Sequence, residues 1–84
     1  MAILDVRSPQ EFATQHVEGA VNFDVELMLQ GNIPEFNKDE EIITYCRSGS
    51  RSGVAEQILK KRGYQNVTNG GGIMEMARHG HNLI

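Results

Sequence analysis

The sequence predicts a small α/β domain with parallel strands, and three observations support that prediction. Short apolar runs alternate with segments of helical pattern along the 84 residues, which is typical of parallel strands joined by helices. Hydrophobic residues make up 39% of the chain and charged residues 23%, as in ordinary globular proteins. The sequence contains no repeat and no linker-like stretch. We therefore expect one domain over residues 1–84.

The clearest helix start lies near the amino terminus. Ser8 suits an N-cap, Pro9 suits the first helical position, and Glu11 stands where a capping box needs its carboxylate. This pattern predicts a helix over residues 9–15, shortly after a first strand at residues 2–6.

The strongest strand signal is the β-branched and aromatic run at residues 41–45, which polar residues bound on both sides. A loop at residues 46–50 follows, and then a helix over residues 51–62 that ends before Gly63. That helix carries one apolar stripe, formed by Val54, Ala55, Ile58 and Leu59.

Weaker patterns predict the remaining elements. We expect short strands at residues 19–23 and 66–68, short helices at residues 25–30 and 73–79, and a glycine turn at residues 69–72.

The residues around the sole cysteine, Cys46, favour a reactive thiolate over a structural one. A lone cysteine is most often a small buried hydrophobe. Here it is the first residue after a strand, at the sheet edge where parallel sheets bind ligands, and the next helix starts about five residues later. Unpaired N–H groups of a helix start and of small loop residues can surround an anion. The residues that follow Cys46 are small or basic: Arg47, Ser48, Gly49, Ser50 and Arg51.

These features lower the pKa of a thiol, and we therefore hypothesise an activated sulfur nucleophile at Cys46. The hypothesis requires main-chain N–H groups that converge on the sulfur and a sulfur that solvent can reach. A Cys46 pKa at or above about 8.5, the value of an unperturbed thiol, would contradict it.

The loop from Cys46 to Arg51 resembles the active-site loop of the rhodanese family of sulfurtransferases. Further matches extend from Ile3 to about Ala77, closest to the small single-domain rhodaneses of the phage-shock type. They comprise Asp5-Val6-Arg7, Glu11-Phe12, His16-Val17-Glu18-Gly19-Ala20, Gly63-Tyr64, Val67 and Gly71-Gly72. Asp24 and Met76 depart from the family, which often has proline and tryptophan near these positions. The resemblance implies a rhodanese-like fold, a small parallel sheet flanked by helices on both faces.

The resemblance also implies the chemistry. The Cys46 thiolate would attack the outer sulfur of thiosulfate, release sulfite and hold a persulfide, which cyanide or a thiol then discharges. Arg47, Ser48, Gly49, Ser50 and Arg51 would bind the substrate through their main-chain amides, with both arginines at the mouth of the site. A basic residue directly after the cysteine goes with thiosulfate in this family, so Arg47 favours that donor.

The expected partners are therefore a small anionic sulfur donor and a thiophilic acceptor. A net charge of −3 disfavours nucleic acid, and no apolar run is long enough for a membrane span. We expect a monomer that needs no cofactor. We also expect no metal site, because His79 and His81 lack further ligands. The absence of a leader pattern favours the cytoplasm, with the periplasm as the alternative if a leader was removed.

Two other functions remain open. Cysteine phosphatases and arsenate reductases have a similar loop, but with five residues between cysteine and arginine instead of four, a ring that suits a tetrahedral oxyanion. A non-enzymatic persulfide carrier or partner-binding module would keep the fold without turnover.

Several polar residues have a structural explanation that we prefer. Arg7 and Glu11 are four residues apart and could pair, and His16 suits the scaffold better than catalysis. The roles of Asp5 and Ser52 stay open, since Asp5 could accept loop N–H groups and Ser52 could support the helix start or contact substrate.

Overall fold

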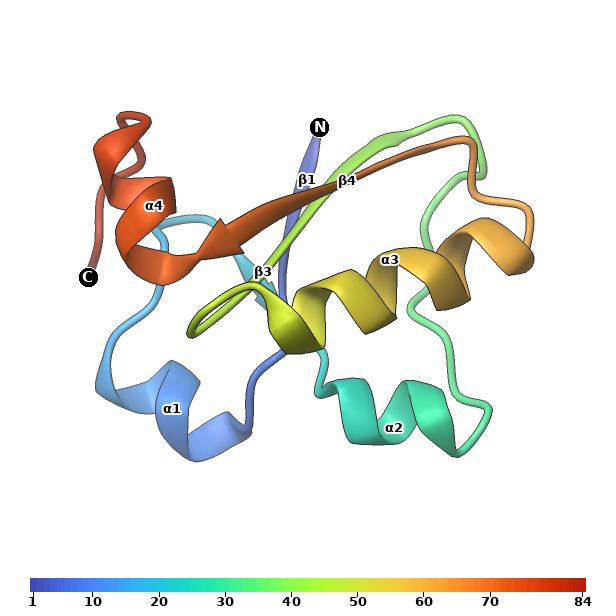
Figure 1. The fold of residues 1–84 in the computed structure, drawn as a ribbon, viewed down its shortest axis with the longest axis horizontal. Helices are drawn as coiled ribbons and strands as arrows, with labels where there is room; N and C mark the ends of the chain where they lie inside the picture. Colours follow the sequence, from blue (N-terminus) through green and yellow to red (C-terminus); the bar gives the residue numbers. More distant parts are fainter.

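Strand and helix alternate strictly along the chain in the computed structural model, which describes residues 1–84 (Figure 1). The elements are β1 (Ala2–Asp5), α1 (Pro9–Thr14), β2 (Val21–Asn22), α2 (Val25–Leu29), β3 (Glu41–Cys46), α3 (Ser50–Lys61), β4 (Asn66–Gly72) and α4 (Ile73–Arg78). The four strands form one parallel sheet in the order β2-β1-β3-β4. The expected α/β class is confirmed.

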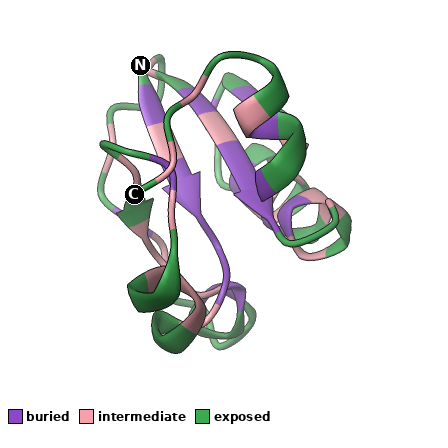
Figure 2. Cartoon of the chain, turned by 90° about the vertical axis from the view of Figure 1, so that its left-hand side faces the viewer, coloured by how far each residue is buried: buried purple, intermediate pink, exposed green.

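Side chains on the two central strands alternate between two apolar clusters, one on each face of the sheet. Leu4 and Ile42 join a cluster that α2 and α3 complete, with Leu59 as a fully buried member. Tyr45 joins a second cluster on the other face, where α4 supplies Met76. Figure 2 shows the strands as the buried centre and the helices as the exposed exterior. Helices therefore cover both faces, as the resemblance implied.

The helix start at Ser8 follows the expected pattern. The Glu11 main-chain N–H donates to the Ser8 hydroxyl at 3.3 Å, and the Ser8 N–H donates to a Glu11 carboxylate oxygen at 3.1 Å. Pro9 is the first residue of α1, so the capping box is confirmed, although the helix ends at Thr14.

The glycine-rich segment differs from its prediction. Residues 69–72 belong to β4 and not to a turn, because Gly70, Gly71 and Gly72 have no side chains that would clash with α4, β3 and the loop after β3. A Cβ at Gly72 would meet the Arg47 carbonyl oxygen at 2.4 Å, and one at Gly70 would meet the Met76 sulfur at 2.7 Å. The β3–β4 register shifts between Thr44 and Cys46, beside these glycines.

The chain end returns to the loop between α1 and β2. The His16 N–H donates to the Ile84 carbonyl at 2.9 Å, and Val17 forms an isolated bridge with Leu83. No helix in the structure is both long and apolar enough to span a membrane.

Candidate active site

Cys46 is the last residue of β3, and only three residues separate it from α3. The chain turns back within this short connection because Gly49 adopts φ 100°, in the left-handed region that favours glycine. A Cβ at Gly49 would also come within 3.3 Å of Gly71 Cα on β4. Position 49 therefore favours glycine both for its backbone conformation and for the close approach of β4.

Hydrogen-bond donors converge on the Cys46 sulfur from this connection and from the first turn of α3. The Gly49 N–H donates to Cys46 Sγ at 3.0 Å, and the Ser52 hydroxyl lies 3.4 Å from the same atom. The main-chain N–H groups of Ser48 and Ser52 also stabilise the thiolate. The sulfur thus accepts hydrogen bonds from one main-chain N–H group and one hydroxyl, and the main-chain N–H groups of Ser48 and Ser52 help to lower the pKa of the thiol.

These donors outweigh the effect of burial on the thiol. Burial raises the pKa of Cys46, but the hydrogen bonds from Ser52, Ser48 and Gly49 together lower it by a larger amount. The resulting pKa lies below that of an ordinary thiol. A thiolate is the nucleophilic form of cysteine, and this environment increases its population at neutral pH.

The exposure of Cys46 differs from the expectation. Only 1% of the residue is accessible to solvent, because its side chain packs in the apolar cluster between the sheet and α3 while the loop lies against the sulfur. An external sulfur donor can reach Sγ only after part of the loop moves. Arg47 and Ser48 are the exposed residues next to Cys46, and no hydrogen bond holds either side chain.

The two loop arginines lie in different environments. Arg51 makes a bidentate ion pair with Glu11 of α1, at 2.7 and 2.9 Å, and this pair lowers the pKa of Glu11 to about 2. Arg47 is exposed and lines a polar hollow of about 280 Å³, beside Arg7 and Glu11. Arg51 is therefore already neutralised, whereas Arg47 remains free to meet an anion.

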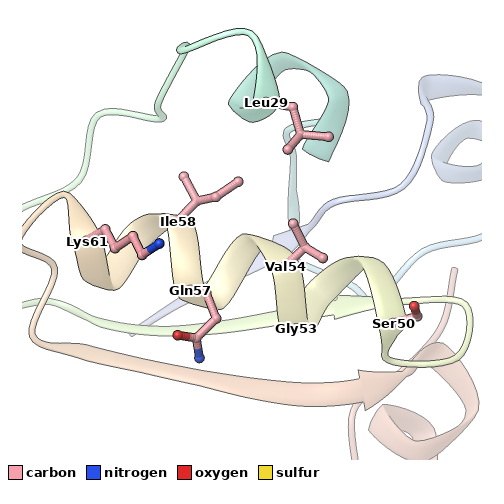
Figure 3. A pocket seen from close by; sticks show the side chains of 7 residues that line it. All are labelled: Leu29, Ser50, Gly53, Val54, Gln57, Ile58 and Lys61. Atoms are coloured by element: carbon pink, nitrogen blue, oxygen red, sulfur yellow. The ribbon is translucent and has the colours of Figure 1, made fainter.

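The remaining predicted loop residue, Ser50, lies away from the sulfur. It is the first residue of α3 and stands at the end of a groove of about 450 Å³ between α2 and α3 (Figure 3). In this view Leu29 and Val54 approach each other across the groove, and Lys61 lies at its far end. No hydrogen bond joins Ser50 to Cys46 Sγ, in contrast to Gly49 and Ser52.

Asp5, at the end of β1, belongs to a closed structural network. Its carboxylate is fully buried and accepts hydrogen bonds from the Arg7 N–H, the Arg7 guanidinium and the Tyr45 hydroxyl. Burial and the Asp5 contact raise the pKa of Tyr45. The expected Arg7–Glu11 pair is wrong, because Asp5 binds Arg7 and Arg51 binds Glu11.

The sequence analysis missed Asn69 of β4 as a part of the site. Its side-chain oxygen lies 2.6 Å from the Ser52 hydroxyl, and its side-chain nitrogen donates to the Gly49 carbonyl at 3.0 Å. The prediction of a glycine turn hid this residue, since only a strand at this position brings it beside the loop. His79 and His81 line a separate hollow with Asn69, and no group of three or more potential metal ligands forms.

Comparisons with known proteins identify the family. A family model described as a rhodanese-like domain matches residues 1–78. Thiosulfate sulfurtransferase PspE of Escherichia coli (strain K12) is 35% identical over 77 residues, which cover 88% of this chain and 72% of that protein. A sulfurtransferase of Allochromatium vinosum is 38% identical over 83 residues, which cover 98% and 77% respectively. A solved rhodanese with anions from E. coli has a TM-score of 0.81 at 29% identity, and the match covers 99% of this chain and 95% of that chain.

Proposed function

Because this chain belongs to the family of rhodanese-like sulfurtransferase domains, we propose that it moves the outer sulfur of thiosulfate to a thiophilic acceptor through a persulfide on Cys46. The observation that carries the proposal is the convergence of the Gly49 N–H and the Ser52 hydroxyl on Cys46 Sγ, in a loop whose donors hold the pKa of the thiol below its ordinary value. Two similar proteins, PspE and the A. vinosum protein, are named as sulfurtransferases, and PspE is named for thiosulfate.

In the first step, the Cys46 thiolate attacks the outer sulfur of thiosulfate. A new sulfur–sulfur bond forms, the old one breaks, and its electron pair leaves with sulfite. The terminal sulfur of the resulting persulfide carries the negative charge. Preorganised N–H dipoles of the loop stabilise this charge without rearrangement of solvent. In the second step, cyanide or a thiolate attacks the terminal sulfur, and Cys46 returns as a thiolate.

The donor must first be attracted to the site and admitted to it. Arg47 supplies a cation without a protein partner, which attracts a dianion despite the chain's net charge of −3. We infer that Arg47 and Ser48 move when thiosulfate binds, because the sulfur is 1% exposed at rest. Ser50 and Arg51 complete the proposed substrate-binding loop through their main-chain amides.

A phosphatase or arsenate reductase is the less favoured function. In that chemistry the arginine at the end of the loop must clasp an oxyanion, whereas Arg51 is bound on both terminal nitrogens by Glu11. The loop between Cys46 and Arg51 is also one residue shorter than the five residues that such enzymes have.

Steady-state assays distinguish these functions. With thiosulfate and cyanide we expect thiocyanate and sulfite in equal amounts, and with an aryl phosphate we expect no release of phosphate. Release of phosphate with no thiocyanate would overturn the proposal. Persulfide formation without turnover would instead identify a carrier module.

We further propose that the chain acts as a single rhodanese domain and as a monomer, because the hydrogen-bond donors to Cys46 Sγ come from the six residues that follow it and need no second subunit. We propose the cytoplasm as its compartment, since reducing conditions there keep a free thiol such as Cys46 reduced. Sedimentation of the purified protein and fractionation of cells test these two points.

A further inference from the structure

We propose that Asn69 is a positioning residue for the sulfur chemistry, one that holds the Ser52 hydroxyl and the Gly49 peptide in place around Cys46. Asn69 lies on β4, the edge strand next to β3, and its side chain contacts both of these groups. The inference rests on the proposed function for its catalytic meaning, although the contacts themselves do not depend on it.

The orientation of the Asn69 amide is fixed by its partners. Its oxygen accepts the Gly71 main-chain N–H at 2.9 Å, and its nitrogen donates to the Gly49 carbonyl at 3.0 Å. A flipped amide would set a donor against a donor and an acceptor against an acceptor, so only one orientation satisfies both contacts. Gly53 leaves the room for this arrangement, because a Cβ there would approach the Asn69 nitrogen to 3.3 Å.

The Ser52 hydroxyl has one hydrogen and three acceptors within reach, which are the Asn69 side-chain oxygen, Cys46 Sγ and, at 3.4 Å, the Gly71 carbonyl oxygen. Asn69 Oδ1 lies 2.6 Å from Ser52 Oγ, a short distance for a hydrogen bond between oxygens, and Cys46 Sγ lies 3.4 Å away. A neutral sulfur is a weak acceptor, so the hydroxyl then donates to Asn69. A thiolate is a charged acceptor, and rotation of the hydroxyl brings the same hydrogen to it without movement of any heavy atom.

This choice of acceptor follows the negative charge during the reaction. In the resting thiolate the charge is on Sγ, and Ser52 donates to it. In the persulfide the charge moves one bond outward, Sγ becomes neutral, and the hydroxyl returns to Asn69. When Ser52 turns away, the Asn69 oxygen keeps its hydrogen bond from Gly71, so no buried acceptor loses its last partner.

The second contact of Asn69 supports the main-chain donors. The Gly49 N–H donates to Cys46 Sγ at 3.0 Å, and Gly49 is also the residue with φ 100°. Its carbonyl is held both by Asn69 and by the Gly53 N–H at 3.1 Å. One side chain on β4 thus steadies the hydroxyl donor and the closest main-chain donor.

Titratable and charged groups surround this arrangement on both sides. Arg47, Arg51 and Glu11 lie on the side of the loop, and Glu75, His79 and His81 line the hollow beside Asn69. A test of Asn69 must keep these groups unchanged and compare variants that carry the same charge.

The first test uses the unmodified protein without thiosulfate. As Cys46 is titrated from thiol to thiolate, the side-chain amide resonances of Asn69 should shift with the midpoint of Cys46, because its oxygen loses the Ser52 hydrogen. The side-chain amide of Asn66, which lies on the same strand and donates to the Asp39 carbonyl, should not follow that midpoint. If the Asn69 side-chain amide resonances did not shift with the Cys46 midpoint, the proposal would be overturned.

The second test measures the pH dependence of Cys46 alkylation in four variants, Asn69→Asp, Asn66→Asp, Ser52→Ala and the double variant with Ser52→Ala and Asn69→Asp. Asn69→Asp should raise the pH midpoint by about one unit, which is a tenfold lower proton concentration, because a carboxylate retains the Ser52 hydroxyl and cannot donate to Gly49. Asn66→Asp places the same charge on the same strand and should shift the midpoint much less. In a Ser52→Ala background the effect of Asn69→Asp should fall to less than half, since the shared hydrogen is gone.

Equal shifts for Asn69→Asp and Asn66→Asp, or additive effects of Asn69→Asp and Ser52→Ala, would contradict the proposal. Neither test uses sulfur transfer, so failure of the proposed function and failure of this inference give different results. A protein that shows the coupling but does not react with thiosulfate would retain the inference and lose the proposed substrate.

Discussion

Two neighbouring strands end in buried groups that can carry negative charge, and their surroundings differ. At the end of β1, the Asp5 carboxylate is bound by the full charge of Arg7 and by the Tyr45 hydroxyl. At the end of β3, Cys46 Sγ is bound only by neutral donors, which are main-chain N–H groups and a serine hydroxyl. The loop cation Arg51 is paired with Glu11 instead.

The difference separates a structural anion from a reactive one. A buried carboxylate with a matched counter-ion is held in one state, and its loss leaves an unpaired buried charge. A sulfur among neutral dipoles is stabilised as an anion, yet it can form a bond and pass its charge to a second atom under the same donors. The same sheet edge therefore holds one fixed group and one that can react.

Substitution of Cys46, the reactive anion, should have the largest effect, and that effect should be on activity. In Cys46→Ser we expect the turnover of thiosulfate to be abolished, because a hydroxyl in this site stays protonated and cannot hold a persulfide. The free energy of unfolding, measured in urea, should change by no more than about 1 kcal/mol, since serine is close to cysteine in size. Residual turnover above the uncatalysed rate would place the nucleophile elsewhere.

Loss of the fixed anion should instead affect stability. In Asp5→Asn we expect the free energy of unfolding to fall by about 3–5 kcal/mol, because Arg7 is left buried without its counter-ion. Asp24→Asn is the matched control, since Asp24 caps α2 and asparagine caps helices equally well. If the free energy of unfolding fell by a similar amount in both variants, the Asp5 network would not stabilise the fold more than an ordinary helix cap does.

A smaller effect is expected from the free cation beside the reactive loop. In Arg47→Gln we expect the KM for thiosulfate to rise by about tenfold at low salt and less at high salt, because electrostatic attraction is screened. Arg78→Gln removes the same charge from the end of α4, outside the hollow that Arg47 lines, and should leave the KM unchanged. Equal KM values in all three proteins would remove Arg47 from the site.

The smallest effect concerns the ion pair between α1 and α3. The Arg51 guanidinium lowers the pKa of Glu11 to about 2, so the pair stabilises the fold fully above the ordinary carboxyl pKa of about 4.3. This contribution is lost as the pH falls from that value through about 2. Both side chains are about one-third exposed, so we expect the pair to contribute only about 1 kcal/mol. This contribution is measured as the difference between the free energies of unfolding of wild type and Glu11→Gln as a function of pH. A difference that persists at the acid end would contradict the assignment.

The local elements of this fold could be predicted from the sequence because their signals are local. The capping box at Ser8 and the β-branched run of β3 each lie within a few residues, and the positive φ of Gly49 follows from a short loop. The parallel sheet follows from the alternation of these elements. The position of Cys46 at a strand end was predictable for the same reason.

Contacts between distant segments could not be predicted in the same way. Glu11 served the expected capping box, but its ion pair with Arg51 spans forty residues. Glycines 70–72 resemble a turn in sequence, and only the packing of α4, β3 and the loop after β3 explains why this strand cannot carry side chains there. The burial of Cys46 and its link to Asn69 depend on that same approach of β4.

The mass of the intact protein after reaction with thiosulfate tests the central claim most directly. We expect the wild-type chain to gain the mass of one sulfur atom on Cys46, and cyanide to remove it. The Cys46→Ser chain, treated in the same way, should gain nothing. An unchanged wild-type mass, or an equal gain in the serine variant, would contradict a persulfide held by the loop after β3.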